Sequence, residues 1–587
     1  MFLKIQKQKQ RTYLTIAHSY RNPETKKNQT KIIQSLGYLD ELEQTYPDPI
    51  AHFKQIAKQM NEEEKAKKVH YRIEIKPDET ITSDNRKNLG YIALSKVYHE
   101  LGLDKFFHNR ARGTKAKFPI NDIMKTEVFS RILFPNSKKS TYENRHLFFE
   151  KNDYELADVY RCLSFIDTIS RDTQLHIHRK VTELTGRNCE LLYYDTTNYY
   201  FEIDEADELR KKGVSKEHRP EPIVQMGLLM DESGIPIAYK LFPGNTNDCT
   251  TLKPIMKEIK RDFGVGKTII VADKGLNTHK NIVFNILKGD GYIYSQSVRK
   301  AEKELKDYVL DDDGYRHLNS DYKLKSRFYP RNLKVEDKFG KTKTIRVDEK
   351  QIIFYSEKYA KKARIEREKA IEKAQRLIQH PGQFRKSTAY GSAKYIHNIA
   401  FDKSTGEVID TGKSLSINLD KIREEERFDG YYAIITNELD KTDSDVIDIY
   451  RGLWKIEESF KITKSHLQAR PVYLSRHDRI NAHFLICFIA LVILRLLEFR
   501  LNQLRLPDSQ KIPAVRIASS LSLAAGYHLQ ENWYLFSYID PVLLELERAF
   551  GFPFSRKFLT SGYIKNIFSY PVFGAFTVQS ISKIDPS

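Results

Sequence analysis

Residues 190–202 read ELLYYDTTNYYFE, and they open the part of the chain whose fold is clearest from sequence. The apolar run that ends at Asp195 has the composition and length of a buried strand. Two more strand-like runs follow, IVQMGLLM at 223–230 and IPIAYKLF at 235–242. These runs predict three consecutive strands.

Beyond these strands, the pattern alternates between helix and strand. A helical run covers 250–263, the strand-like KTIIVA covers 267–272, and a second helix and strand cover 279–297. The resulting β-β-β-α-β-α-β order predicts a mixed α/β sheet. After an irregular, Lys- and Tyr-rich stretch, the strand GYYAIITN at 430–437 leads into a helix that begins near residue 443.

The regions before the predicted sheet have different patterns. Residues 1–45 contain three alternating runs typical of strands, and the first 31 residues hold eight basic side chains and one acid. From about 90 to 188, apolar residues recur every three or four positions, which predicts a helical domain.

Composition limits the classes of function. The 587 residues suggest three to five domains or subdomains. Lys and Arg number 97 against 78 Asp and Glu, a net charge of +19, which favours a polyanionic partner, either nucleic acid or an anionic membrane surface. Four scattered cysteines without a C-x-x-C pair argue against a disulfide framework or a cysteine zinc site and for a reducing, cytoplasmic compartment.

No stretch of the sequence predicts a membrane span. The most apolar run, FLICFIALVIL at 484–494, has 11 residues, whereas a span needs about 20. A buried core helix is the better interpretation. The N-terminal residues also lack the apolar segment of a signal peptide.

Two carboxylates stand directly after strand-like runs. Asp195 ends the first strand and Asp273 follows KTIIVA, and either alone is most often a turn former or a helix cap. If the two strands are parallel neighbours, however, both carboxylates reach one edge of the sheet. Two carboxylates that close repel each other unless a cation lies between them, and Mg²⁺ suits such oxygen ligands.

A third acid, Glu457, lies in the helical stretch DVIDIYRGLWKIEESFKITKSHLQ at 445–468. One face of this helix is an apolar stripe that would pack on the core. The adjoining stripe consists of Tyr450, Trp454, Glu457, Lys461 and Lys464. This second stripe is either a solvated charged face or a functional edge that carries an acid, aromatic rings and bases.

Three carboxylates that hold two divalent ions suit phosphodiester chemistry. Lys464, Lys461 and Arg451 would then contact DNA phosphates, and Tyr450 or Trp454 would stack on a displaced base. A competing nucleotide motif, GVGKT at 264–268, is rejected because it leads into a strand, whereas a P-loop leads into a helix.

At these residues the sequence resembles the DDE transposases of bacterial insertion sequences, in the branch with a Tyr-(2)-Arg-(3)-Glu-(6)-Lys signature. Tyr450, Glu457 and Lys464 match this spacing, while Leu453 stands at the Arg position. The run VADKGLNT around the second acid and GLLMDESGIPIAYKLFPGNTNDCTTL between the acids also look like segments of that family.

The resemblance implies a fold and an activity. The fold is an RNase H-like α/β core, interrupted by a mainly β insertion, in which Asp195, Asp273 and Glu457 bind two Mg²⁺ ions that Mn²⁺ can replace. The activity is DNA transposition: binding of terminal inverted repeats, strand cleavage, and joining of 3′-hydroxyl ends to target DNA. The alternatives are an RNase H-like nuclease without strand transfer and an inactive DNA-binding relic.

The implied partners are double-stranded DNA and a second copy of the chain in the DNA complex, with no membrane and no nucleotide. The enzyme would act in the cytoplasm on bacterial DNA. The predicted regions are a basic, β-rich N-terminal region (1–75), a helical DNA-binding domain (76–188), the first part of the core (189–297), the insertion (298–429), the second part of the core with the Glu457 helix (430–510), and a candidate dimerisation region (511–587).

Overall fold

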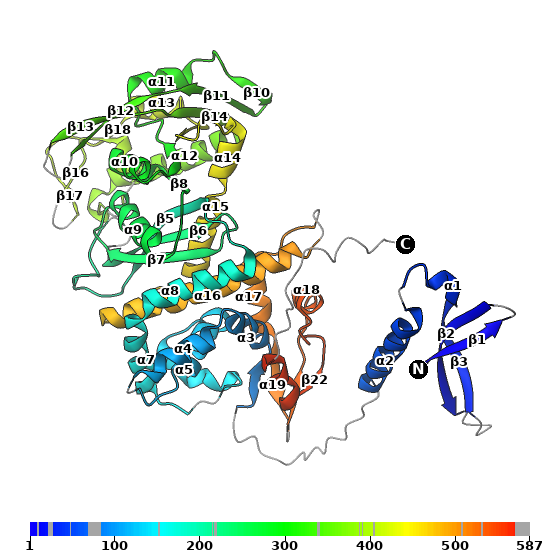
Figure 1. Cartoon of the computed structure of the whole chain (residues 1–587). Helices are drawn as coiled ribbons and strands as arrows, with labels where there is room; N and C mark the ends of the chain where they lie inside the picture. The colour runs from blue at the N-terminus through cyan, green and yellow to red at the C-terminus, as the bar shows by residue number, and fades with distance from the viewer. Residues whose placement is uncertain are drawn as a thin grey trace. The chain divides into compact units, whose positions relative to one another are not determined.

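The computed structural model describes residues 1–569 apart from 9–10, 22–27, 47, 68–83, 115, 151–152, 214, 217–219, 337–340, 387, 390, 403–405, 506–508 and 530–531. Contacts between residues divide the chain into two units, Met1–Thr82 and Ser83–Ser587 (Figure 1). Residues 570–587, the end of the predicted dimerisation region, lie outside the described part of the chain.

The N-terminal unit is an antiparallel sheet with a helix packed against it. Its elements are β1 (Phe2–Gln8), β2 (Arg11–Arg21), β3 (Asn28–Tyr38), α1 (Leu39–Leu42) and α2 (Pro49–Lys67). The strands pair in chain order, so the three alternating runs do form strands. Leu14 and Ile16 of β2 are fully buried, and Phe53 and Ala57 of α2 are buried as well. Helix α2 was not predicted from the sequence.

A nine-stranded sheet forms the centre of the second unit, in the order β10-β11-β14-β19-β9-β8-β5-β6-β7. The strands predicted at 190–297 are β5 (Leu191–Tyr200), β6 (Ile223–Asp231), β7 (Pro236–Pro243), β8 (Ile269–Ala272) and β9 (Gly291–Gln296). Strands β5, β6 and β7 form an antiparallel meander, and β8 and β9 continue the sheet parallel to β5.

The strands β5, β6, β8 and β9 of this sheet are buried on both faces, because their side chains point alternately into two cores. Along β5, Leu192 and Tyr194 share a core with helices α9 (Leu252–Asp262) and α10 (His279–Leu287). Tyr193 and Tyr199 of the same strand belong to the larger core on the opposite face. The nearly continuous apolar runs that predicted these strands reflect this burial on both sides.

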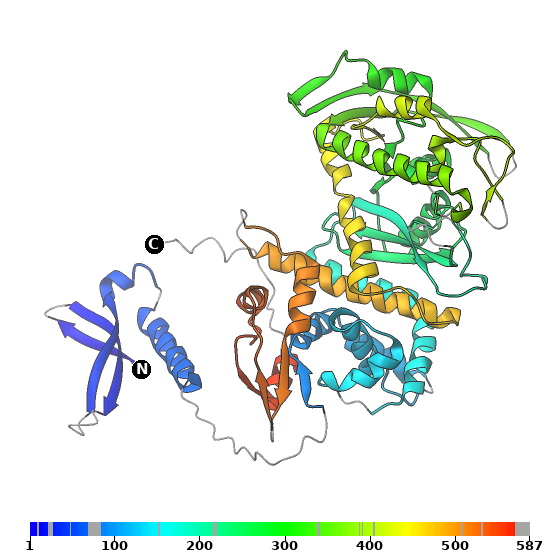
Figure 2. The ribbon, with the colours of Figure 1, turned by 180° about the vertical axis from the view of Figure 1, so that it is seen from behind.

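The larger core is built around one long helix, α16 (His477–Gln503). Figure 2 shows α16 between the sheet and the helices of the region 91–185, and it packs most extensively on α5 and α7. Those helices are α3 (Tyr91–Glu100), α4 (Leu103–Arg112), α5 (Ile120–Leu133), α6 (Lys138–Glu143), α7 (Leu156–Thr168) and α8 (Ser170–Thr185). Helix α16 is long and apolar enough to cross a bilayer. However, 94% of its most apolar 18-residue stretch is buried within the protein, as expected for a core helix.

The end of the chain packs back onto the start of this unit. A small sheet in the order β22-β21-β20-β4 joins C-terminal strands to residues at the unit's beginning. Its strands are β4 (Arg86–Asn88), β20 (Ala525–His528), β21 (Trp533–Phe536) and β22 (Phe558–Thr560). The C-terminal helices are α17 (Ala514–Leu523), α18 (Pro541–Phe550) and α19 (Ser561–Ser569).

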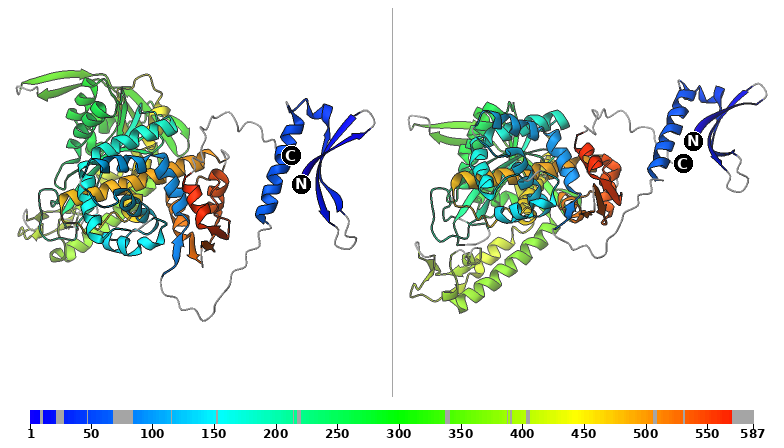
Figure 3. Two further views of the ribbon diagram at one scale, coloured as in Figure 1. Left: turned by 60° about the horizontal axis from the view of Figure 1, so that its bottom comes forward. Right: turned by 90° about the horizontal axis from the view of Figure 1, so that it is seen from below.

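The segment 298–429 is not the mainly β insertion that we expected. It contains α11 (Lys303–Leu310), α12 (Glu357–Gln379) and α13 (Leu419–Glu426) besides short hairpins. Its strands β10 (Arg316–Asn319), β11 (Tyr322–Phe328) and β14 (Lys350–Ser356) extend the large sheet, because β14 pairs with β19 (Tyr431–Thr436). In the right-hand view of Figure 3, α12 and the short strands after it lie at the margin of the unit.

Candidate active site

Asp195 and Asp273 lie at the same level on neighbouring strands. Strands β5 and β8 are parallel, and Tyr193 pairs with Val271. Asp195 lies two residues after Tyr193, and Asp273 lies two residues after Val271. The two carboxylates therefore lie at the same end of the two paired strands. Because β8 ends at Ala272, no strand in the described part of the chain pairs with that edge of β5 beyond Tyr193. The expectation of adjacent parallel strands is therefore correct.

The surroundings of Asp195 disfavour its negative charge. Its side chain is 22% exposed, and burial raises its pKa to about 6, with further contributions from Asp273 and Asp248. Lys216 and the backbone N–H of Thr196, which donates to Asp195 Oδ1 at 2.7 Å, act in the opposite direction. Asp273 accepts hydrogen bonds from Ser295 Oγ at 2.7 Å and from Tyr450 Oη at 3.4 Å. A buried carboxylate beside a second acid is suited to hold a cation.

The helix that carries Glu457 is broken, whereas the sequence predicted one continuous helix. It consists of α14 (Asp443–Arg451), α15 (Trp454–Lys461) and a π-helical turn at Ile462–His466. The break is at Gly452, where a Cβ atom would lie 2.0 Å from Tyr193 Oη. Tyr193 Oη donates to the carbonyl of Ile449 at 3.0 Å. A residue without a side chain thus lets the helix pair approach β5 closely.

Two residues of the predicted functional stripe reach the aspartates. Tyr450 donates to Asp273, and Lys464 Nζ lies 5.7 Å from the ring centroid of Tyr199 and interacts electrostatically with Asp195. Burial, and then the positive charge of Lys216, lower the pKa of Lys464 to about 8. Tyr450 thus contacts Asp273, and Lys464 lies within electrostatic range of Asp195.

The middle of the stripe is exposed to solvent. Glu457 and Lys461 are exposed, and Trp454 is 55% exposed. Arg451 pairs with Asp448 at 3.1 Å and lies 5.3 Å from the ring of Tyr322. Among the described residues, no three His, Cys, Asp or Glu side chains are grouped closely enough to hold a metal ion. The structure thus brings together two of the three predicted acids.

Two parts of the chain match models of transposase families. Residues 3–70 match the N-terminal domain of IS1634 family transposases, and residues 205–493 match the transposase DDE domain, a range that includes Asp273 and Glu457 and begins after Asp195. The chain belongs to the DDE transposases of insertion sequences. As a DDE transposase, it is an enzyme that cuts DNA.

Solved structures give weaker likenesses to this transposase. A piggyBac transposase synaptic complex with hairpin DNA is 7% identical, with a TM-score of 0.35, and the match covers 74% of this chain and 79% of that one. A Mos1 transposase paired-end complex with the left transposon end is 11% identical, with a TM-score of 0.13, and covers 40% and 65%. A comparison with curated proteins found no match.

Sequence reasoning missed Lys216, Asp248 and Gln225 of the transposase, a group that is linked to Asp195 through Lys216. Lys216, from the connection between β5 and β6, lies 3.9 Å from Asp195 Oδ1 and 3.7 Å from Asp248 Oδ2. Gln225 of β6 donates its Nε2 hydrogen to Asp248 Oδ1. Asp248 ends the PGNTND run that carried part of the family resemblance, so that run could have identified it. Lys216 lies in no pattern that marks it.

A cavity of about 250 Å³ opens directly beside Asp273. Bases and aromatic rings line it, from the turn after β9 (Arg299), from α12 (Tyr359 and Lys362), from β19 (Tyr432) and from α14 (Tyr450). Rings and positive charges next to an acid suit a nucleic acid strand.

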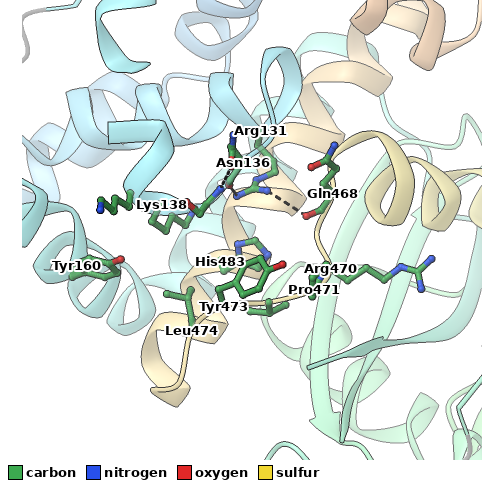
Figure 4. Close-up of a pocket in the computed structure, with 13 residues that line it drawn as sticks. Arg131, Asn136, Lys138, Tyr160, Gln468, Arg470, Pro471, Tyr473, Leu474 and His483 are labelled. Atoms are coloured by element: carbon green, nitrogen blue, oxygen red, sulfur yellow. Dashed lines mark hydrogen bonds between the residues drawn. The ribbon is translucent and has the colours of Figure 1, made fainter. Parts of the chain in front are cut away.

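A second cavity of about 250 Å³ lies between α5, α6 and the segment 468–474 (Figure 4). Its buried cations already have partners within the protein. Arg131 donates to the carbonyls of Leu467 and Gln468, both at 3.3 Å, and Lys138 pairs with Glu127. This second cavity is therefore a feature of packing between the helices and the segment that follows the π-helical turn.

Proposed function

We propose that this transposase binds the terminal inverted repeats of an insertion sequence, cuts DNA strands by metal-dependent hydrolysis, and joins the freed 3′-hydroxyl ends to target DNA. The observation that carries this proposal is the position of Asp195 and Asp273 at one level of two adjacent parallel strands. The strand order supports an RNase H-like core, since β5 to β7 form a meander and β8 and β9 are added parallel beside β5.

The donor atoms of the two aspartates fit the divalent ions that the family implies. Carboxylate oxygens are the ligands that Mg²⁺ prefers, and the raised pKa of Asp195 reflects a buried carboxylate whose charge is incompletely balanced. Asp195, Asp273 and Glu457 are the proposed ligands, with Glu457 included for its place in the Tyr-Glu-Lys spacing. When bound, such ions activate the attacking oxygen and stabilise the leaving oxygen.

Other side chains would position the DNA. Lys464, Lys461 and Arg451 are proposed to contact phosphates, since all three lie on or beside the stripe that starts at the acids. Tyr450 and the exposed Trp454 are proposed to stack on a displaced base.

The remaining regions are assigned to binding and assembly. We propose that regions 1–75 and 76–188 recognise the element ends, in keeping with the net charge of +19. The enzyme is proposed to act as a homodimer in the DNA complex, with contacts from 511–587.

A cleavage and joining assay tests the proposed function. The substrate is a duplex that carries the element's own ends, read from the genomic flanks of the coding sequence. We expect nicks at the element boundary in Mg²⁺ or Mn²⁺, none in EDTA, and joined products when target DNA is added. Nicks without joined products would indicate a nuclease, and binding without nicks in either metal would indicate an inactive relic.

The lowered pKa of Lys464 predicts a pH dependence of DNA binding. A lysine with a pKa of about 8 loses its charge between pH 7 and 9, whereas an ordinary lysine stays charged. Over this range, the affinity for element-end DNA should fall by about two- to fivefold, the value of one charged contact. The Lys464→Arg variant should change less, because its guanidinium remains protonated. Fluorescence anisotropy at constant ionic strength measures both, and equal losses would exclude Lys464 as the titrating group.

A further inference from the structure

The packing cavity between α5, α6 and the segment 468–474 is lined by several cations (Figure 4). They are Arg131, Lys138, Lys139 and Arg470, and no Asp or Glu of the described residues joins them in the lining. Buried Glu127 balances the charge of Lys138 from outside the cavity. A cavity lined by cations and by no acid suits an anion.

Arg131 is a buried cation of this cavity whose charge is not balanced. Its side chain is 4% exposed, and its hydrogen bonds go to three backbone carbonyls, one of them that of Asn136 at 3.0 Å. These acceptors are neutral, and Arg131 forms no ion pair with any described residue. Its Nε atom is buried and has no hydrogen-bond partner in the described part of the chain. A bound anion would offset both costs.

The neighbouring His483 shows the effect of this positive charge. Its side chain is 5% exposed and lines the cavity. Burial, and then the charges of Arg131 and Lys138, hold the pKa of His483 well below its usual range. His483 is therefore neutral at pH 7, and the positive charge of the cavity comes from arginine and lysine, which stay protonated.

Size and lining indicate which anion fits. The cavity has a volume of about 250 Å³. Pockets that enclose a drug-sized ligand have about 300–1,000 Å³, so a phosphate group fits this cavity better than a whole nucleotide does. The ring of Tyr473, which also lines the cavity, is 71% exposed. An exposed ring beside cations suits the strand to which such a phosphate would belong.

The cavity can be reached along the strand that carries Asp195. Lys464 Nζ lies 5.7 Å from the ring centroid of Tyr199, and the guanidinium carbon of Arg470 lies 5.5 Å from that of Tyr200. Tyr200 follows Asp195 by five residues on β5, a distance of about 17 Å along a strand. A DNA strand that follows β5 away from Asp195 would pass Lys464 and then Arg470, which lines the cavity.

We propose that this cavity binds one backbone phosphate of element-end DNA, with Arg131 as its buried cation and with Lys139 and Arg470 as further cations. The inference rests on the proposed function and adds a DNA contact to it. A length of about 17 Å corresponds to about five base pairs, so the bound phosphate should lie about five or more nucleotides from the cut. The alternative is that Arg131 only ties the segment 468–474 to α5.

Single methylphosphonate substitutions in the duplex test this proposal with the full-length protein. Each duplex carries one uncharged methylphosphonate in place of a phosphate, at successive positions from the cut. At one position about five or more nucleotides from the cut, wild-type affinity should fall about tenfold. Arg131→Met should bind the unmodified duplex about tenfold more weakly and lose nothing further at that position, because both changes remove the same contact. Fluorescence anisotropy measures all of these affinities.

A second variant keeps the test valid if Arg131→Met does not fold. The double variant Lys139→Gln, Arg470→Gln leaves the contacts of Arg131 with the backbone carbonyls in place. It should bind element-end DNA about three- to tenfold more weakly and lower the slope of log K against log salt by about one to two. Lys288→Gln removes an exposed lysine at the end of α10 and, as the control, should match the wild type.

Inorganic phosphate distinguishes a free anion from DNA. Suppose that phosphate raises the unfolding temperature of the wild type but not of Arg131→Met, while both proteins have the same methylphosphonate profile. The cavity would then be a site for free phosphate, and its assignment to DNA would be wrong. Equal profiles without a phosphate effect would show that Arg131 only ties the two segments together.

These outcomes separate the inference from the function on which it rests. Equal methylphosphonate profiles, together with cleavage and joining by the wild type, would overturn the phosphate site and leave the proposed function standing. Failure of the wild type to bind element-end DNA would overturn both.

Discussion

Asp195→Asn is expected to lower DNA strand cleavage by about 10³-fold or more, the scale of loss when a group central to catalysis is removed. The amide keeps the shape of the carboxylate but cannot supply a negative charge to a divalent ion. Binding to element-end DNA should persist, or tighten slightly, because one negative charge fewer faces the phosphates. Single-turnover cleavage of a labelled duplex and anisotropy on the same duplex measure the two effects.

Matched variants make this result specific. Asp204→Asn removes an exposed carboxylate from the connection that follows β5 and should leave cleavage unchanged. Asp273→Asn should behave as Asp195→Asn does. Glu457→Gln is the most informative variant, because Glu457 is exposed and, among the described residues, does not form a closely grouped set of three carboxylates with the aspartates. Cleavage at wild-type rates by Asp195→Asn would refute the assignment of the catalytic acids.

The largest effect on stability is expected from Arg187→Met. Arg187 Nε lies 2.6 Å from Asp231 Oδ2, and the two side chains are 0% and 4% exposed. Arg187 Nη2 also donates to the carbonyl of Pro236 at 3.0 Å, across the β6–β7 turn. Removing the guanidinium leaves a buried carboxylate unpaired, which should lower the free energy of unfolding by about 3–5 kcal/mol.

The pH dependence of this variant has a definite sign. Burial already raises the pKa of Asp231, and loss of Arg187 raises that pKa further. The variant should therefore be most stable at low pH and lose stability as the pH rises through the folded-state pKa of Asp231. Arg161→Met is the control, because Arg161 is 64% exposed, and it should change the free energy by less than about 1 kcal/mol. Urea denaturation followed by circular dichroism measures both, and equal effects would contradict the role of the buried pair.

The strands around the acids were predictable because their burial on both faces leaves long apolar runs. The same runs located Asp195 and Asp273, since a carboxylate that follows such a run stands out. The regular spacing of Tyr450, Glu457 and Lys464 placed them on one stripe, although the helix between Tyr450 and Lys464 is interrupted. The break in this helix lies at Gly452, which packs against Tyr193 of β5. Local periodicity does not reveal such a contact between distant parts of the chain.

Features that depend on pairing between distant segments were not predictable. The segment 298–429 extends the sheet because β14 meets β19, and no local pattern indicates that pairing. Lys216 and Asp248 belong to connections between strands, where side-chain positions follow from the folded chain and not from a repeat. Gln225 sits in an apolar run, where it looks like an exception until its contact with Asp248 is known.

Helix α16 has a consequence for how this transposase can be dissected. It follows the segment with Glu457 in the chain. Its buried side chains nevertheless share one core with residues from 89–181 and with the face of the sheet that carries Tyr193 and Tyr199. A fragment that stops at residue 188 would therefore present an uncovered apolar surface to water. The helices before the sheet and the strands that hold the acids thus share one hydrophobic core through α16. Helices α3 to α8 could therefore be exchanged between related transposases only together with α16.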